Sequence, residues 1–261
     1  MIETLEGNLY DYPSYYDLVY GSDWKAEFHF LTGCFQQFAQ IPVNHVFEPA
    51  CGTGRLLYRL AASGLQVSGL DLNPHAVEYC NQRLKRKGFQ DRVICEDMTD
   101  FQLQSAVDAG FNMINSFRHL VTHEQAVAHL RCMARAIQPG GIYVLGIHLT
   151  PTEGEPTDFE SWSAQQGHLC VTTELACTDR DPGNRLERFS MTYDIYTPTR
   201  RQQLKDSILF RTYTAPQFAE LVAEVPGWEI ITTYDFHYQL EQPIEVGPTT
   251  EDVVYVLHNQ T

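Results

Sequence analysis

Short apolar runs alternate with helical patterns from residue 45 to residue 149, and this alternation limits the possible folds more than any other feature. The expected strands cover residues 45–50, 66–71, 91–98, 110–117 and 142–149. The helical patterns cover residues 55–62, 73–85 and 123–136. Strands that alternate with helices at this spacing predict βαβ units and a parallel sheet.

The C-terminal part adds two strands, at residues 228–236 and 252–259, with no helical pattern between them. Two consecutive strands without a crossover helix are most simply antiparallel neighbours. We therefore expect a single α/β domain over residues 1–261. Its three αβα layers would surround a seven-stranded, mostly parallel sheet with an antiparallel last strand.

Two segments lie outside this alternation. Residues 1–40 carry five tyrosines and then an apolar stripe at helical spacing, which predicts an N-terminal helical cap. Residues 151–213 contain three extended stretches, at 168–178, 185–197 and about 204–213, with a hairpin turn between the first two. We expect an antiparallel β insertion of two or three strands after the fifth strand.

Charge and composition exclude several classes of protein. The chain has 33 acidic and 18 basic residues and a formal net charge of −15, which repels nucleic acid and anionic membrane surfaces. No run of 18 apolar residues and no signal-peptide pattern is present, so we expect a cytoplasmic protein. The seven cysteines form no CxxC pair, and no histidine spacing indicates a metal.

A glycine turn in "VFEPACGTGRLL" (residues 46–57) follows the first of these strands and precedes a helix. This geometry lets the backbone approach a ligand closely. Asp71 ends the next strand, where a carboxylate can accept both hydroxyl hydrogens of a ribose. Glu48 would repel a diphosphate but attract the ammonium of an amino acid. A ligand with a ribose, an adenine and an amino-acid tail is S-adenosylmethionine.

Four motifs in register carry a resemblance to a known family. "FEPACGTG", "GLDLN", "EDM" and "IQPGGIYVL" resemble, in order and spacing, the motifs of class I S-adenosylmethionine-dependent methyltransferases of the small-molecule type. The resemblance covers nearly the whole chain and implies a Rossmann-like fold. It also implies that residues 1–40 cover the cofactor and that the insertion at 151–213 is a substrate lid.

The resemblance assigns cofactor contacts residue by residue. Asp71 would hold the ribose, Asp97 and the Met98 amide would meet the adenine, and Glu48 would face the methionine ammonium. The full implied set is Tyr16, Tyr20, Glu48, Ala50, Cys51, Gly52, Thr53, Gly54, Arg55, Asp71, Leu72, Asn73, Asp97, Met98, Asn115 and Ser116.

Three residues are candidates for catalysis. His119 and His148 follow the fourth and fifth strands at the active-site edge, where a histidine can act as a general base. A loop histidine that caps the backbone is an equally good interpretation. Tyr16 is a candidate from the lid. Arg118 beside His119 could hold a substrate carboxylate, and Arg185, Arg188, Arg200 and Arg201 could steer an anionic substrate or be solvated surface.

We expect methyl transfer to a nitrogen or oxygen of a small molecule. "NSFRHL" stands where members that methylate base amino groups carry an Asn/Asp-Pro-Pro-aromatic motif, and the Pro-Cys nucleophile of cytosine C5 enzymes is also missing. Two alternatives stay open: a nicotinamide-dinucleotide-dependent oxidoreductase, and a non-catalytic S-adenosylmethionine-binding protein. The missing third glycine of GxGxxG counts against the oxidoreductase. The oligomeric state is not readable, although the tyrosine-rich N-terminus could form a dimer contact.

Overall fold

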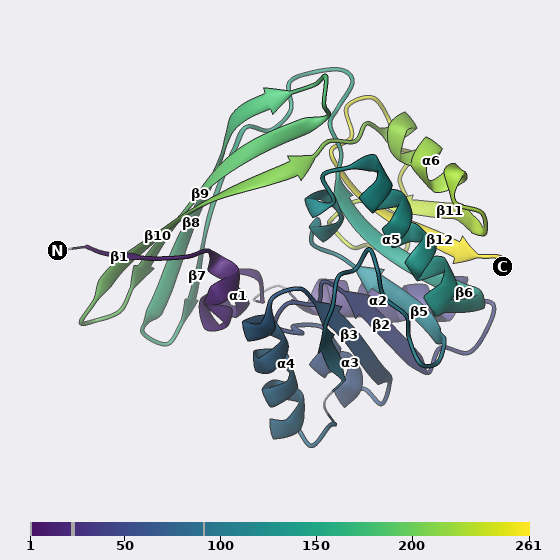
Figure 1. Ribbon diagram of the computed structural model, residues 1–261, viewed down its shortest axis with the longest axis horizontal. Helices are drawn as coiled ribbons and strands as arrows, with labels where there is room; N and C mark the ends of the chain where they lie inside the picture. Colours follow the sequence, from purple (N-terminus) through teal and green to yellow (C-terminus); the bar gives the residue numbers. More distant parts are fainter. Residues whose placement is uncertain (1, 22–23, 91) are drawn as a thin grey trace.

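The computed structural model describes residues 2–21, 24–90 and 92–261, which form two β-sheets with helices packed against them (Figure 1). The larger sheet has seven strands. In spatial order these are β11 (Trp228–Tyr234), β12 (Asp252–Asn259), β6 (Ile137–His148), β5 (Val107–Asn112), β2 (His45–Pro49), β3 (Gln66–Asp71) and β4 (Val93–Cys95). β12 runs antiparallel to both of its neighbours, β11 and β6, and all the other neighbouring pairs are parallel. The expected sheet is confirmed.

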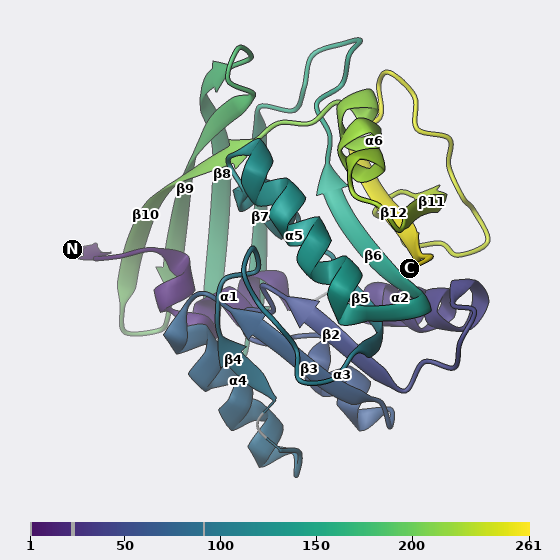
Figure 2. The same ribbon diagram turned by 45° about the vertical axis from the view of Figure 1, so that its right-hand side comes forward.

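Helices cover both faces of this sheet (Figure 2). On one face lie α2 (Trp24–Phe38), α3 (Leu57–Ala62) and α4 (Pro74–Arg86). On the other lie α5 (His123–Ala136) and α6 (Ala215–Glu224). Asn73 caps α4 by accepting from the amides of His75 and Ala76, and α5 and α6 both begin with a capping box.

The second sheet contains the insertion. In spatial order its strands are β1 (Glu3–Leu5), β10 (Arg201–Arg211), β9 (Leu186–Tyr196), β8 (Leu169–Asp181) and β7 (Phe159–Gln166). The expectation of two or three insertion strands was wrong, because the insertion supplies four. The sequence of β7 is mostly polar and exposed and lacks alternation, so it gives no strand signal on its own. The three-residue β1 is defined by parallel pairing with β10.

Three expected boundaries also differ. The fifth expected strand starts at residue 142, but β6 already begins at Ile137. Its "QPGG" segment (138–141) forms a bulge, where the pairing with β5 jumps from Val107–Ile137 to Ala109–Ile142. The fourth strand of the large sheet ends at Asn112, and a 3-10 helix, η2 (Ser116–His119), follows it. The helix after the glycine turn begins at Leu57.

The N-terminal segment lies between the two sheets (Figure 1). Its elements are the 3-10 helix η1 (Leu9–Asp11) and α1 (Pro13–Tyr20). Leu9 and Val19 are buried against the insertion strands. On the other side, Asp17 of α1 accepts from Thr53 Oγ1 at 2.9 Å and from Arg83 Nη1 of α4 at 2.8 Å. The segment therefore links the insertion to the glycine turn.

A buried ion pair joins η2 to the insertion. Arg118 is 2% exposed and Glu187 of β9 is 4% exposed, and the guanidinium donates to the carboxylate. Arg118 Nε also donates to the carbonyl of Arg211 at 2.9 Å, and Arg180 donates to the second oxygen of Glu187 at 3.2 Å. Both charges are thus compensated without water.

We predict that Glu187→Ala lowers the free energy of unfolding by about 3–5 kcal/mol, because it leaves the Arg118 charge buried without a partner. Urea denaturation measures the loss. The matched control is Arg188→Ala at the next position of β9, which is exposed and should change stability by less than about 0.5 kcal/mol. Equal stabilities for the two variants would contradict a stabilising role of the pair.

Candidate active site

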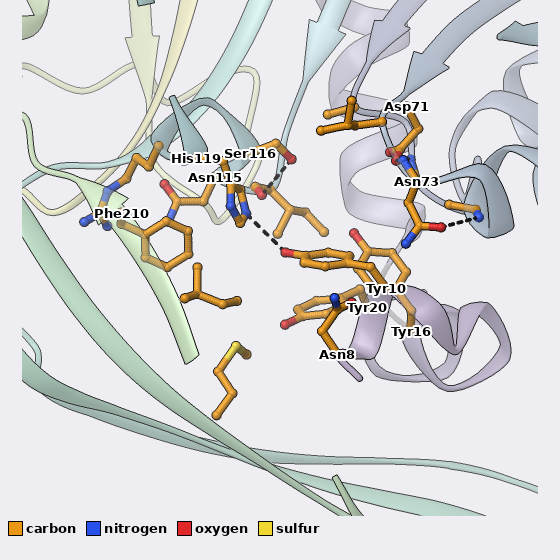
Figure 3. Close-up of a pocket in the computed structure, with 18 of the residues that line it drawn as sticks. Asn8, Tyr10, Tyr16, Tyr20, Asp71, Asn73, Asn115, Ser116, His119 and Phe210 are labelled. Atoms are coloured by element: carbon orange, nitrogen blue, oxygen red, sulfur yellow. Dashed lines mark hydrogen bonds between the residues drawn. The ribbon is translucent and has the colours of Figure 1, made fainter. Parts of the chain in front are cut away.

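A cavity of about 710 Å³ lies at the carboxyl ends of the parallel strands, between the large sheet, the N-terminal segment and the insertion (Figure 3). This volume falls in the range of small-molecule sites. The structure brings most of the expected site residues into its wall. They are Tyr16, Tyr20, Ala50, Gly52, Thr53, Asp71, Leu72, Asn73, Asp97, Met98, Asn115, Ser116, His119 and His148.

The glycine turn after β2 has left-handed backbone at three positions, with φ of 52° at Ala50, 53° at Gly52 and 66° at Gly54. A Cβ at Gly52 would lie 3.2 Å from the Tyr16 ring, and one at Gly54 would collide with Cys80 Sγ. The left-handed backbone favours glycine at both positions, and at Gly54 the space beside Cys80 also excludes a side chain. The result is a bare stretch of backbone at the cavity wall.

Asp71 connects this turn to the start of α4. One carboxylate oxygen accepts from the Gly52 amide at 2.7 Å, and the other accepts from the Asn73 amide at 2.8 Å. Burial raises the pKa of Asp71, and the backbone hydrogen bonds oppose that rise. A carboxylate offers about four lone-pair sites, so Asp71 can still accept from two ligand hydroxyls.

Glu48 does not line the cavity. It is 6% exposed, and its Oε2 has no hydrogen-bond partner among the described residues. Burial raises its pKa well above the usual value, although the Arg55 charge opposes this. A buried carboxylate oxygen without a donor is costly. An ammonium, directly or through a water, would satisfy it, so this orphaned oxygen fits the amino-acid end of S-adenosylmethionine.

Three more expected cofactor residues, Cys51, Gly54 and Arg55, also lie outside the cavity wall. The expectation that Arg55 contacts the cofactor is not supported by the position of its side chain. Its guanidinium donates to both oxygens of Glu27 in α2, at 2.8 and 2.5 Å, and both side chains are buried. The long side chain turns away from the ligand because α2 supplies a buried counter-charge. Cys51 is buried beneath the turn, and Gly54 allows the close approach of Cys80.

A hydrogen bond between Tyr10 and His119 crosses the cavity, with 3.1 Å between the phenol oxygen and Nε2 (Figure 3). The His119 ring also packs edge-on against Phe210 of the insertion, at 5.0 Å between centroids. Burial, helped by the nearby Arg118 charge, lowers the pKa of His119 to about 4. Burial also raises the pKa of Tyr10 well above its usual value, so both groups are neutral at pH 7.

The tyrosines of α1 form part of an aromatic stack beside the glycine turn. Tyr16 lies 4.9 Å from Tyr20 and 5.6 Å from Tyr10, and Tyr20 lies 6.0 Å from Trp162 of β7, all between ring centroids. Burial raises the pKa of Tyr20 to about 12, with a bond to Tyr193 opposing it. These phenols are therefore protonated at pH 7.

His148 is held at the cavity edge by two carboxylates. Its Nδ1 lies 2.8 Å from Asp252 Oδ1, and its Nε2 lies 3.2 Å from Glu251 Oε2. Asn115, in a left-handed conformation, accepts from the His148 amide at 3.0 Å. Both ring nitrogens are engaged, so His148 is poorly placed to take a proton from a substrate. The expected role of Arg118 also changes, because its charge is used by Glu187.

Sequence reasoning missed several residues of the site. Tyr10 is one tyrosine among five near the N-terminus, and nothing in its spacing separates it from the others. Trp162 and Phe210 come from the insertion, whose strands were only partly predicted. His129 of α5 is fully buried and contacts the Met98 carbonyl and the Tyr143 hydroxyl, both at 3.0 Å. It thereby fixes the loop that carries Asp97, and its place on the apolar face of a helix was the available signal.

Residues 46–141 match the family model described as "Methyltransferase domain". The matched segment contains the glycine turn, Asp71, Asp97 and His119, which the cavity brings together. The chain is a class I S-adenosylmethionine-dependent methyltransferase. S-adenosylmethionine is its cofactor.

Curated proteins and solved structures that resemble this chain are also methyltransferases. The methyltransferase is 25% identical over 198 residues to the dTDP-3-amino-3,4,6-trideoxy-alpha-D-glucopyranose N,N-dimethyltransferase of Streptomyces venezuelae, covering 69% of this chain and 81% of that protein.

Among solved structures, it superposes on an S-adenosylmethionine-dependent methyltransferase from Clostridium acetobutylicum with a TM-score of 0.78, at 15% identity and over 97% and 100% of the two chains. It superposes on CalS10, an amino pentose methyltransferase from Micromonospora echinaspora, with a TM-score of 0.74, at 19% identity and over all of both chains. At these identities the structural likeness supports the fold.

The described part of the methyltransferase has neither a membrane-spanning helix nor a metal-binding cluster. Within residues 2–21, 24–90 and 92–261, no helix has the length and apolar character needed to cross a membrane. Over the same ranges, no group of three or more His, Cys, Asp or Glu side chains is arranged to hold a metal ion.

We predict that Asp71→Asn weakens the binding of S-adenosylhomocysteine to the methyltransferase about 10- to 150-fold. The substitution removes a charged acceptor, which is worth about 1.5–3 kcal/mol. Calorimetric titration measures the change, and Asp100→Asn, at an exposed position outside the cavity, is the control. Unchanged affinity in Asp71→Asn would remove Asp71 from the ribose site.

Proposed function

We propose that this methyltransferase methylates an amine nitrogen of a small molecule. The observation that carries the proposal is the neutral Tyr10–His119 pair, which offers lone pairs inside the cavity without adding positive charge. A protonated histidine near a sulfonium would repel it, whereas a neutral one can accept a hydrogen bond from an amine. The Streptomyces venezuelae relative, an N,N-dimethyltransferase, supports nitrogen as the target.

We also propose how the cofactor is held. Asp71 accepts from the ribose hydroxyls, Asp97 and the Met98 amide meet the adenine, and Glu48 compensates the ammonium of the methionine end. Tyr16 and Tyr20 cover the glycine turn from α1. In this proposal residues 1–40 act as a cap over the cofactor, and residues 151–213 act as a lid over the acceptor.

The chemistry needs positioning more than proton transfer. S-adenosylmethionine supplies an electrophilic methyl carbon on a sulfonium leaving group. The amine lone pair would form the new N–C bond as the C–S bond breaks, S-adenosylhomocysteine would leave, and the methylated nitrogen would release a proton to water. The phenol oxygen of Tyr10 keeps a lone pair in either tautomer of His119, so it can accept a hydrogen bond from the amine and direct the amine lone pair, while His119 holds the phenol in place. With a pKa of about 4, His119 is too weak a base to deprotonate an alkylammonium, so the amine reacts in its neutral form.

A paired screen tests nitrogen against oxygen. The protein is incubated with S-adenosylmethionine and either phenethylamine or 2-phenylethanol, and in a second pair with glucosamine or glucose. Mass spectrometry detects methylated product and S-adenosylhomocysteine. We expect product from the amine member of at least one pair and from neither alcohol. Methylation of an alcohol, or of neither member of both pairs, contradicts the proposal.

We predict that His119→Asn lowers kcat/KM about 2- to 12-fold, the cost of one neutral hydrogen bond. The acid limb of the pH profile should stay where it is, because His119 gains its proton only as the pH falls toward 4. That limb follows the protonation of the acceptor amine itself. His123→Asn at the start of α5, outside the cavity, is the control. A loss of about 10²–10⁴-fold together with a vanished acid limb would instead make His119 a general base.

A further inference from the structure

The side chains that line the cavity are rich in carboxylates and poor in available cations. Five acidic residues contribute to the wall: Asp71, Glu96, Asp97, Glu160 and Asp252. Among the lining residues of the described chain, Arg118 is the only arginine or lysine. Its guanidinium is 2% exposed and paired with Glu187, so its charge is already compensated.

The two lining histidines do not supply a free cation either. His119 has a pKa of about 4 and is neutral at pH 7. His148 lies between Glu251 and Asp252, so any charge on it is balanced by two carboxylates. The field in the cavity is therefore unfavourable to an anionic ligand.

The insertion wall of the cavity is mostly apolar. Its lining strand residues are Phe159, Glu160 and Trp162 of β7, Leu175 of β8, Phe189 and Met191 of β9, and Ile208 and Phe210 of β10, so Glu160 is the one charged side chain among them. Such a surface binds hydrocarbon or aromatic groups by burying their area. A phosphate placed there would lose its hydration and gain no counter-charge, and the Trp162 indole is the one N–H side-chain donor among these residues.

The basic residues of the insertion lie elsewhere. Arg188 and Arg201 occupy the alternate positions of β9 and β10, where they are exposed. Arg185 donates to the carbonyl of Thr212 at 3.3 Å and packs on Tyr213. None of these residues, nor Arg200, lines the cavity, so the expectation that they steer an anionic substrate finds no support in the geometry.

We propose that the methyl acceptor is an amine on an apolar, phosphate-free body, such as an arylalkylamine, seated with that body against the insertion sheet. This rests on the proposed amine methylation and narrows its substrate class. It separates this chain from the nucleotide-linked amino sugar named for the Streptomyces venezuelae relative, because a diphosphate would meet carboxylates and aromatic rings here.

The test is a binding measurement on the complex with S-adenosylhomocysteine. Tyramine and O-phosphotyramine are titrated separately by calorimetry, since they share the amine and the ring and differ by one phosphate. We expect saturable binding of tyramine that is at least tenfold tighter than that of the phosphate ester. Equal or tighter binding of O-phosphotyramine, or no saturable binding of tyramine, overturns the proposal.

A pair of neighbouring variants assigns the preference to the insertion wall. Met191→Arg adds a cation on the inward face of β9, and Thr192→Arg adds the same charge at the next position, on the opposite face. Met191→Arg should reduce or reverse the preference for tyramine, while Thr192→Arg should keep it. Unchanged affinity for S-adenosylhomocysteine shows that both variants are folded. Identical preferences in the two variants overturn the assignment to this wall.

The tyramine titration and the paired screen test the two proposals separately. A preference for the phosphate ester would leave nitrogen methylation intact and exclude only the apolar acceptor. Methylation of an alcohol in the paired screen would overturn nitrogen as the target, whatever the two tyramines do.

Discussion

One carboxylate organises the part of the cavity beside the glycine turn and α4. We call this part the cofactor half, because we propose that the cofactor binds there. Asp71 accepts from the amides of Gly52 and Asn73, so the end of β3 sets both the turn after β2 and the first turn of α4. Its position follows from the parallel sheet, which brings the carboxyl ends of β2 and β3 to the same edge. Burial makes an ionised Asp71 costly unless its oxygens are occupied, and the two amides reduce that cost. The same arrangement leaves lone pairs toward the ligand.

The part of the cavity lined by the insertion is the acceptor half in the function that we propose. Its shape depends on how the insertion packs against the rest of the chain. The N-terminal segment packs on the insertion through Leu9 and Val19 and reaches the glycine turn through Asp17. The buried pair of Arg118 and Glu187 makes a second connection, from η2 to β9. Because the two connections lie on different elements, the insertion is held over the cavity from two directions. These connections join the elements that carry Tyr10, His119 and Phe210.

The sequence predicts the parts of this structure that rest on local periodicity or on short motifs. The seven strands of the large sheet and the glycine turn could be identified, because each is encoded within a few consecutive residues. The strand β7 was missed because it is polar and edge-exposed and is defined by its pairing with β8. Tyr10 and His119 are 109 residues apart, so their contact exists only in the assembled fold. The direction of Arg55 likewise depended on Glu27, which lies 28 residues away.

The two halves of the cavity therefore differ in what lines them: backbone groups in one and side chains of the insertion in the other. The cofactor half is built from backbone amides, the carboxylate of Asp71, which we propose faces the ribose, and a turn with two glycines, so one and the same ligand constrains its chemistry. The acceptor half is built from side chains that alternate along the strands of the insertion, and each can change without disturbing the ladder beneath it. Methyl transfer itself asks little of the protein beyond alignment and exclusion of water. In the function that we propose, the acceptor is therefore selected by the cavity-lining residues of β7 to β10, and in this chain those residues are apolar except for Glu160.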